Sequence, residues 1–235
     1  MSAPPVALLF DVFGTCVDWR TGITNEVAAV ARAKGVALDA AAFADAWRGN
    51  YQPSMEVVRA GKRDYAPLDV LHRETLVELC AKFGLPLDPA ETDRLNFAWH
   101  RLDPWPDTVA GLVRLRTKFI LSPLSNGNVR LLVDMAKRAG LPWDTVLSTE
   151  VFKAYKPQPQ TYLGAAAMLG LAPGEVMMVA AHNSDLRHAQ KLGLQTAFVA
   201  RPTEYGPHQK EDFAPEGDWT LVARDFKHLA ELLGC

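Results

Sequence analysis

The amino-acid sequence predicts an α/β protein, with a Rossmann-like, doubly wound parallel sheet and an all-α helical insertion directly after the first strand. Three observations predict this fold. Short, continuous apolar runs recur along the chain and are typical of strands buried on both faces. From residue 119 onward helical patterns alternate with these runs, which indicates βαβ units with helices on both faces of the sheet. Residues 18–101 hold several helical patterns but no convincing strand.

The first strand is expected at residues 6–10, where the sequence VALLF is apolar throughout and ends directly before Asp11. An unbroken apolar run fits a central strand better than a strand with one solvated face. Further runs predict the other strands, at residues 119–124, 145–147, 176–181 and 196–199, with a weaker candidate at 219–222.

Amphipathic patterns predict the helices, and glycines and prolines separate them. The helices between the later strands are expected at residues 108–118, 129–139, 158–169, 184–192 and 225–233. The insertion is expected to hold helices at 24–34, 39–48, 68–83 and 89–100. Two prolines around Trp105 mark the return to the sheet, since proline disfavours helix at the preceding residue. We therefore predict a core of residues 1–17 and 102–235 and a helical unit of residues 18–101.

The composition is that of an ordinary globular protein. The 235 residues carry 25 Lys and Arg against 27 Asp and Glu, a net charge of −2, so nothing global favours binding to nucleic acid or a membrane surface. No apolar stretch is long enough to predict a spanning helix. Three cysteines are an odd number at spacings that suit neither a disulfide framework nor a zinc site. We expect reduced thiols and a cytoplasmic location.

Polar side chains follow the predicted strands at the points where the strands end. They are Asp11 and Thr15 after the first strand, Ser125 and Asn126 after the second, Lys156 after the third, and His182 and Asp185 after the fourth. Each alone has a simpler explanation as a turn residue, a helix cap or a solvated charge. Ligands of open parallel sheets bind outside the carboxyl ends of the strands. All of these residues together at that edge predict an active site.

Four segments of the chain resemble, in the same order, the four motifs of the haloacid dehalogenase-like hydrolase superfamily. They are FDVFGT at 10–15, LSN at 124–126, KP at 156–157 and AAHNSD at 180–185. The helical insertion stands where that superfamily has its cap domain. The resemblance implies that Asp11 is a nucleophile that forms a covalent ester. It also implies that Ser125 holds the oxygens of Asp11, that Lys156 neutralises charge, and that Asp185 positions water or the lysine.

Phe13 distinguishes between branches of this superfamily. Phosphatases that resemble this chain have a second aspartate there as general acid, whereas Phe13 cannot donate a proton. A leaving halide needs no proton, unlike a leaving alkoxide. Residues 11–15 also resemble the Asp-x-(Tyr/Phe)-Gly-Thr of L-2-haloacid dehalogenases, which implies hydrolysis of short-chain 2-haloalkanoic acids to 2-hydroxy acids, with Phe13 at the substrate. No metal and no other cofactor is expected, because Lys156 can supply the positive charge.

The resemblance extends to residues that would contact the substrate. The sequence AWR at 46–48 resembles a dehalogenase motif whose arginine reaches the substrate and the departing halide, which implies that role for Arg48; a helical arginine is more often a surface residue. Tyr162 and Asn126 match family residues near the active site, although Tyr162 could equally pack on the sheet. Backbone amides around Thr15 and Cys16 are expected to bind the substrate carboxylate, with Cys16 in the pocket wall.

The fourth motif departs from the family pattern. A related subgroup has Ala-His-Pro-Trp-Asp, so His182 and Asp185 match while Asn183 and Ser184 replace Pro-Trp. Losing that tryptophan predicts a larger or more polar pocket. Either Asp185 or His182 would be the base that hydrolyses the ester, and His182 could equally be a helix-start residue bonded to backbone. The alternative function is hydrolysis of another small substrate, such as a phosphate ester, a phosphonate or a strained ring. The resemblance also implies a homodimer.

Overall fold

The structure, a computed structural model, describes residues 4–207 and 209–235. In these residues five parallel strands form one sheet with the order β2-β1-β3-β4-β5. The strands are β1 (Ala7–Phe10), β2 (Ile120–Pro123), β3 (Val176–Ala180), β4 (Gln195–Val199) and β5 (Leu221–Ala223). The predicted α/β class with a parallel sheet is confirmed.

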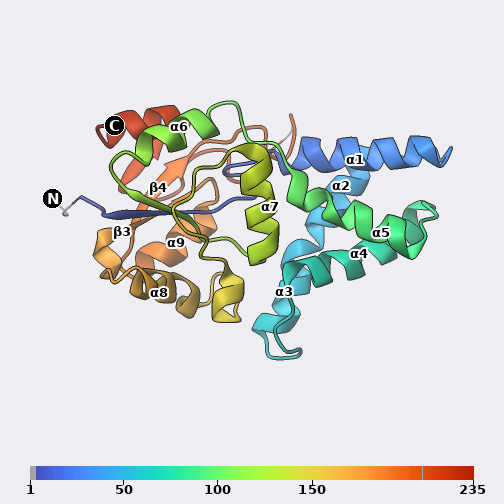
Figure 1. The fold of residues 1–235 in the computed structure, drawn as a ribbon, viewed down its shortest axis with the longest axis horizontal. Coiled ribbons are helices and arrows are strands. Elements are labelled where there is room, and N and C mark those ends of the chain that lie inside the picture. The colour runs from blue at the N-terminus through green and yellow to red at the C-terminus, as the bar shows by residue number, and fades with distance from the viewer. Residues whose placement is uncertain (1–3, 208) are drawn as a thin grey trace.

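Helices cover both faces of the sheet (Figure 1). Leu8 and Phe10 of β1 belong to a buried cluster on one face, and Leu9 belongs to a second cluster on the other. Side chains alternate between the faces of a strand, so one apolar run contributes to two cores. The first cluster includes side chains of α6 (Thr108–Leu115), α7 (Val129–Ala139) and α10 (Phe226–Leu232), and the second those of α8 (Pro159–Met168) and α9 (Asn183–Lys191).

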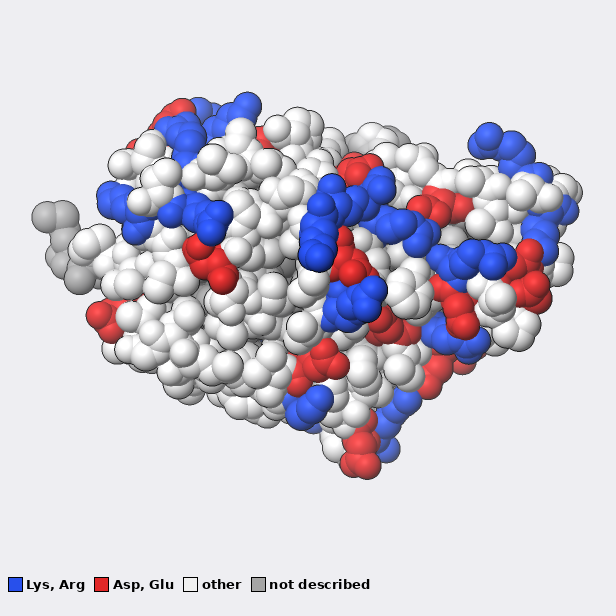
Figure 2. All heavy atoms as spheres, viewed as in Figure 1, with Lys and Arg blue, Asp and Glu red and all other residues white. Residues whose placement is uncertain are grey.

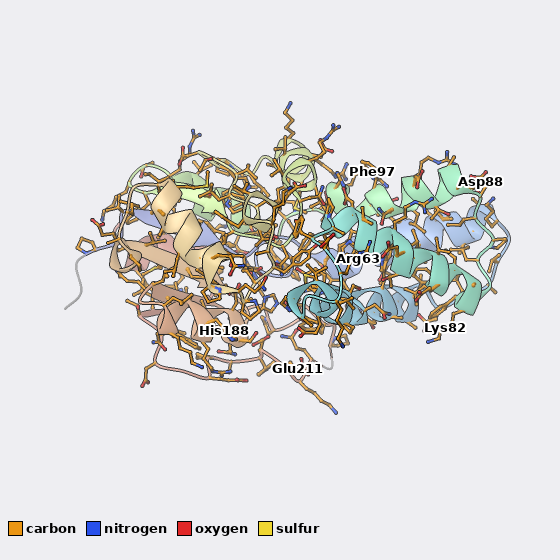
Figure 3. The ribbon with its side chains drawn as sticks, turned by 90° about the horizontal axis from the view of Figure 1, so that it is seen from below. Arg63, Lys82, Asp88, Phe97, His188 and Glu211 are labelled. Atoms are coloured by element: carbon orange, nitrogen blue, oxygen red, sulfur yellow. The ribbon has the colours of Figure 1, made fainter. Side chains whose placement is uncertain are left out.

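Between β1 and β2 the chain forms a group of helices that extends to one side of the sheet, on the right in Figure 1. They are α1 (Trp19–Ala33), α2 (Ala40–Gly49), α3 (Tyr51–Arg59), α4 (Leu68–Phe83) and α5 (Pro89–Asn96), followed by the 3-10 segment η1 (Phe97–Arg101). Asp18, Asp39 and Asp88 begin α1, α2 and α5, because each side chain accepts a hydrogen bond from a backbone amide of the first turn. Lys82 and Asp88 lie at the end of this group farthest from the sheet (Figure 3).

The structure corrects one predicted strand. Residues 145–147 form no strand. Side chains hold this segment beside β2 in place of a backbone ladder: the Leu147 amide donates to Ser122 Oγ at 3.1 Å, and the Leu121 amide donates to Asp144 Oδ2 at 2.9 Å. Two further short 3-10 segments, η2 (Thr149–Phe152) and η3 (Pro173–Glu175), precede α8 and β3.

The helical insertion also differs in detail from the prediction. Helix α3 was not predicted; its Pro53 lies in the first turn, where proline is tolerated. Helix α1 begins at Trp19 and not at residue 24, and the expected helix at 89–100 divides into α5 and η1. On the face shown in Figure 2, basic and acidic side chains are interspersed over this insertion, as the small net charge suggests. No helix within the described ranges is long and apolar enough to cross a membrane.

Candidate active site

The strand order places two of the predicted site residues at a change of direction in the sheet. β1 lies between β2 and β3, and in this topology ligands bind beside β1 and β3 at the carboxyl ends of the strands. Asp11 follows β1 directly, and its amide donates to the Val179 carbonyl of β3 at 3.0 Å. His182 follows β3, directly before α9. The backbone therefore brings Asp11 and His182 to one point on the rim.

Three side chains hold the buried carboxylate of Asp11. Lys156 Nζ donates to Oδ1 at 2.9 Å, Thr15 Oγ1 donates to Oδ2 at 2.8 Å, and His182 Nδ1 lies 3.0 Å from Oδ2. Burial alone would raise the pKa of this carboxyl, but the Lys156 charge and the hydrogen-bonded His182 hold it well below its usual range. Asp11 is thus kept ionised, as a nucleophile must be.

Lys156 lies between two carboxylates. Its Nζ donates to Asp11 and to Asp185, and all three side chains are about nine-tenths buried. Burial would lower the pKa of Lys156, but the two carboxylates raise it above its usual value, so the ammonium stays charged. Asn126 Oδ1 accepts the Lys156 backbone amide at 2.8 Å, and Tyr162 donates its hydroxyl to Asp185 Oδ1 at 2.6 Å.

His182 joins Asp11 to a residue that the sequence analysis missed. Its Nε2 lies 2.9 Å from Oε2 of Glu204, whose side chain is fully buried and also accepts from Trp19 Nε1 at 3.0 Å. Burial would lower the pKa of His182, but the charges of Glu204 and Asp11 raise it well above its usual value. The ring is therefore an imidazolium clamped between two carboxylates. Glu204 follows β4, so extending the strand-end rule to that strand would have found it.

Gly14 makes room for this carboxylate. It has a φ of +84°, and a Cβ added there would lie 2.0 Å from Glu204 Oε1. Glycine adopts that backbone conformation without steric cost. The turn after β1 and the loop after β4 therefore interlock below the pocket.

The turn after Asp11 does not place all of its predicted residues in the pocket. The Cys16 amide donates to the Val12 carbonyl at 2.8 Å and the Cys16 thiol to the Asp11 carbonyl at 3.2 Å, so Cys16 lies behind the site, fully buried. Burial raises the pKa of this thiol further above its usual value. Phe13 is also buried and packs edge-on against Tyr51 and Trp99. Thr15 contacts Asp11 and accepts the Ala181 amide at 2.9 Å, which links the turn to β3.

Ser125 is near the site, but its hydrogen bond is local. Its Oγ accepts the Gly127 amide at 3.2 Å, and no hydrogen bond to Asp11 is present within the described residues. Ser125 therefore shapes the loop that carries Asn126. Asn183, which replaces the subgroup proline, points away from the pocket: its side chain bonds Asp212 and the Ala214 carbonyl and so holds the loop after β4.

Arg48, from the end of α2, completes the pocket from the side of the insertion. Its guanidinium carbon lies 4.2 Å from the centre of the Tyr51 ring, and its buried Nη1 has no hydrogen-bond partner among the described residues. The pocket has a volume of about 370 Å³, and Asp11, Lys156 and Arg48 line it. Its rim includes His188 and Glu211, both labelled in Figure 3. A hollow of about 550 Å³ at the far end of the insertion has a single charged lining residue, Arg73.

Side chains of the insertion are tied to the loops of the sheet. Arg59 Nη1 donates to the Lys156 carbonyl at 2.9 Å. His100 of η1 lies between Asp69 of α4 and Asp134 of α7, at 3.0 Å from each, although burial opposes its protonation. The insertion is therefore anchored on both sides of the pocket.

A divalent cation does not fit the carboxylates of this site. The Lys156 ammonium lies between Asp11 and Asp185 and pairs with both carboxylates, and the apolar Phe13 offers no donor atom beside them. Within residues 4–207 and 209–235, no three His, Cys, Asp or Glu side chains form a group that could hold a metal ion. The positive charge beside the carboxylates comes from Lys156 and His182.

Comparison with known proteins agrees with this arrangement. A family model described as haloacid dehalogenase-like hydrolase matches residues 6–193. The chain belongs to this family. The superfamily and fold that the four motifs implied are thereby confirmed.

Relatives in the haloacid dehalogenase-like hydrolase family match nearly the whole chain. (S)-2-haloacid dehalogenase 4A of Burkholderia cepacia is 32% identical over 227 residues, which are 93% of this chain and 95% of the relative. The crystal structure of a defluorinating L-2-haloacid dehalogenase matches with a TM-score of 0.97 at 48% identity and covers 100% of both chains. A second L-2-haloacid dehalogenase structure has a TM-score of 0.95 at 50% identity, and the match covers 97% of this chain and 98% of the other.

Proposed function

We propose that this protein hydrolyses short-chain 2-haloalkanoic acids to 2-hydroxy acids through an aspartyl ester on Asp11. One observation carries the proposal: an ionised, buried Asp11 and the Arg48 guanidinium line the same pocket. Residue 13 is a phenylalanine, which cannot protonate a leaving oxygen. A carboxylate nucleophile and a cation for the departing anion are what carbon–halogen cleavage needs. The dehalogenases named above support the same reaction class.

The first step is attack by Oδ1 of Asp11. Within the described part of the chain Lys156 is its only hydrogen-bond partner, whereas Oδ2 has both Thr15 and His182. A bond forms between Oδ1 and C2 of the substrate, and the carbon–halogen bond breaks with its electron pair going to the halide. C2 is inverted, and the halide leaves on the side of C2 opposite to Asp11. We assign Arg48 as the group that receives it. Thr15 and Cys16 are fully buried and do not line the pocket, so the expected carboxylate site at this turn is not assigned.

The second step is hydrolysis of the ester. Water adds to the Asp11 acyl carbon and gives one proton to the base. The ester bond then breaks, this proton passes from the base to the leaving oxygen of the 2-hydroxy acid, and Asp11, now with the water oxygen, loses the second proton to solvent. The base is Asp185 or His182. In the resting protein His182 is protonated, but esterification removes the negative charge of Asp11 and so weakens its hold on that proton. Lys156 stabilises the charge that develops on the acyl oxygen.

Other predicted residues would act through these groups. Tyr162 orients Asp185 by its hydroxyl, and Asn126 fixes the Lys156 backbone. We further propose that residues 18–101 act as a cap domain that closes the pocket with Arg48, while residues 1–17 and 102–235 form the catalytic core. The resemblance to L-2-haloacid dehalogenases supports a homodimer and a cytoplasmic location. Light scattering on the purified protein would test the homodimer.

Two measurements test the reaction. Halide release from chloroacetate and from both enantiomers of 2-chloropropionate should proceed with EDTA present, and no release from any of these acids would contradict the proposal. A single turnover in heavy-oxygen water should label Asp11 before the product. If the enzyme required magnesium and hydrolysed phosphate esters or phosphonates, the alternative function would hold.

A further inference from the structure

A second hollow lies directly behind the wall of the active-site pocket. It has a volume of about 410 Å³ and shares four lining residues with the pocket: Arg48, Tyr51, Gln52 and Tyr205. Trp19, Asp45 and Gly49 line only the hollow. One layer of side chains therefore separates the two spaces.

Arg48 lines both the pocket and the hollow. Its guanidinium is held against the rings of Tyr51 and Trp19, at 4.2 and 5.4 Å from their centres. Nη1 of the guanidinium has no hydrogen-bond partner within the described residues, so it is available to an anion. A planar guanidinium donates along its edges, so a small side-chain rotation would move a bound anion from one face of the wall to the other.

The proposed reaction needs a route for the halide at this place. Attack by Asp11 expels the anion on the far side of C2, while the carboxyalkyl group of the substrate stays attached to Asp11 through C2 and blocks the way back. The hollow does not repel an anion strongly. Its acidic lining residue Asp45 is paired with Arg20 through two hydrogen bonds of 2.7 and 2.8 Å. That pair balances the carboxylate charge at the mouth of the hollow.

We infer that the hollow behind Arg48 is a halide-binding exit site, through which the halide leaves while the ester is still on Asp11. This inference rests on the proposed function. It assigns the wall of Arg48, Tyr51, Gln52 and Tyr205 as a gate for a monovalent anion, separate from the opening through which the organic acid enters.

Gly49 offers a way to block the hollow without touching the pocket. It lines only the hollow, is exposed, and a Cβ added there meets no atom within 4 Å. Gly49→Phe should therefore fold and fill the hollow with a ring, while Gly49→Ala leaves it open as the matched control. Asp45→Phe is a second plug from another position, because its pair with Arg20 is partly exposed to solvent and such pairs contribute little to stability.

The experiment is a single turnover of 2-bromopropionate with enzyme in excess. Rapid quenching and mass spectrometry follow the Asp11 ester, and a halide-quenched fluorescent indicator follows free bromide. In the wild type and in Gly49→Ala, bromide should appear together with the ester. In Gly49→Phe and Asp45→Phe the ester should form within about twofold of the wild-type rate. Free bromide should then appear about tenfold more slowly, since a blocked route adds a barrier to release.

Each outcome has a distinct meaning. Bromide that keeps pace with the ester in both plugged variants overturns the exit site but leaves the dehalogenase proposal standing. Absence of an Asp11 ester in the wild type overturns the dehalogenase proposal and the exit site with it. Slowed ester formation in the plugged variants would show that the substrate enters through the hollow, which also overturns the assignment to halide alone.

Discussion

Replacing Lys156 by methionine tests the electrostatics of the site most directly. The Nζ of Lys156 is bonded to Asp11 at 2.9 Å and to Asp185, and these side chains are only 7–10% exposed. Removing the shared partner of a buried ion pair costs about 3–5 kcal/mol, because the remaining charge is left uncompensated. Lys156→Met keeps the length of the side chain and leaves two carboxylates facing each other. We expect a loss of that size in the free energy of unfolding at pH 7.5, together with loss of halide release.

The stability loss in Lys156→Met should also change with pH in a defined direction. In the wild type the lowered pKa of Asp11 stabilises the fold above the ordinary carboxyl pKa of about 4, and this stability is lost as the pH falls through the lowered value. In Lys156→Met one of the two facing carboxyls has a raised pKa, so the deficit should shrink as the pH falls toward 5. The double variant Lys156→Met/Asp185→Asn should recover about 1–3 kcal/mol.

Urea unfolding followed by tryptophan fluorescence measures both effects. The same variants at pH 7.5 and pH 5 provide the comparison, with Asp185→Asn alone to complete the cycle. A loss below about 1 kcal/mol in Lys156→Met would refute the reasoning, because it would mean that the pair is no better than a surface ion pair. An equal loss at both pH values would refute it as well.

Three further predictions follow from the other buried titratable groups. Glu204→Gln keeps the size of the side chain and one acceptor oxygen but removes the charge, so the pKa of His182 should fall; an unchanged imidazole titration by NMR would contradict this. Carboxylates raise the pKa of His100, so its contribution is complete below about pH 6.5 and is lost as the pH rises through the raised value. His100→Asn should therefore cost about 1–3 kcal/mol at pH 5.5 and less at pH 9 in urea unfolding. Dithionitrobenzoate should modify the partly exposed Cys235 in the native protein and leave the buried Cys16 unmodified, and fast reaction of Cys16 would contradict this prediction.

The strand-end rule predicted much of the rim because it rests on topology alone. Asp11 follows β1 and Asp185 lies in the first turn of α9 after β3, and parallel strands bring such positions to one edge whatever the loops between them do. Lys156 was expected after a strand at 145–147 that does not form, so its place at the rim was predicted for the wrong reason. Arg48 was predicted only from the resemblance to the dehalogenases, because the hydrophobic pattern of α2 does not show which of its polar side chains faces the pocket. Local patterns were sufficient for α4 and α7, whose predicted bounds agree with the structure.

The orientation of the remaining site residues could not be predicted, because it depends on which hydrogen bonds their backbone and side-chain groups already make. Cys16 is adjacent to the right turn, but its amide and thiol are both used within that turn. Ser125 is similarly engaged by Gly127. Asn183 stands in the fourth motif, yet it faces the loop after β4 and not the pocket. Sequence position shows that these residues are close to the site, and only side-chain direction shows which of them face it.

The contact between Gly14 and Glu204 makes two loops that are far apart in the chain depend on each other. The carboxylate occupies the volume in which any other residue at position 14 would place its Cβ. A side chain at position 14 would both be strained at this φ of +84° and displace the Glu204 carboxylate from His182. The first turn therefore keeps the charge partner of His182 in place although it contributes no side chain of its own at position 14.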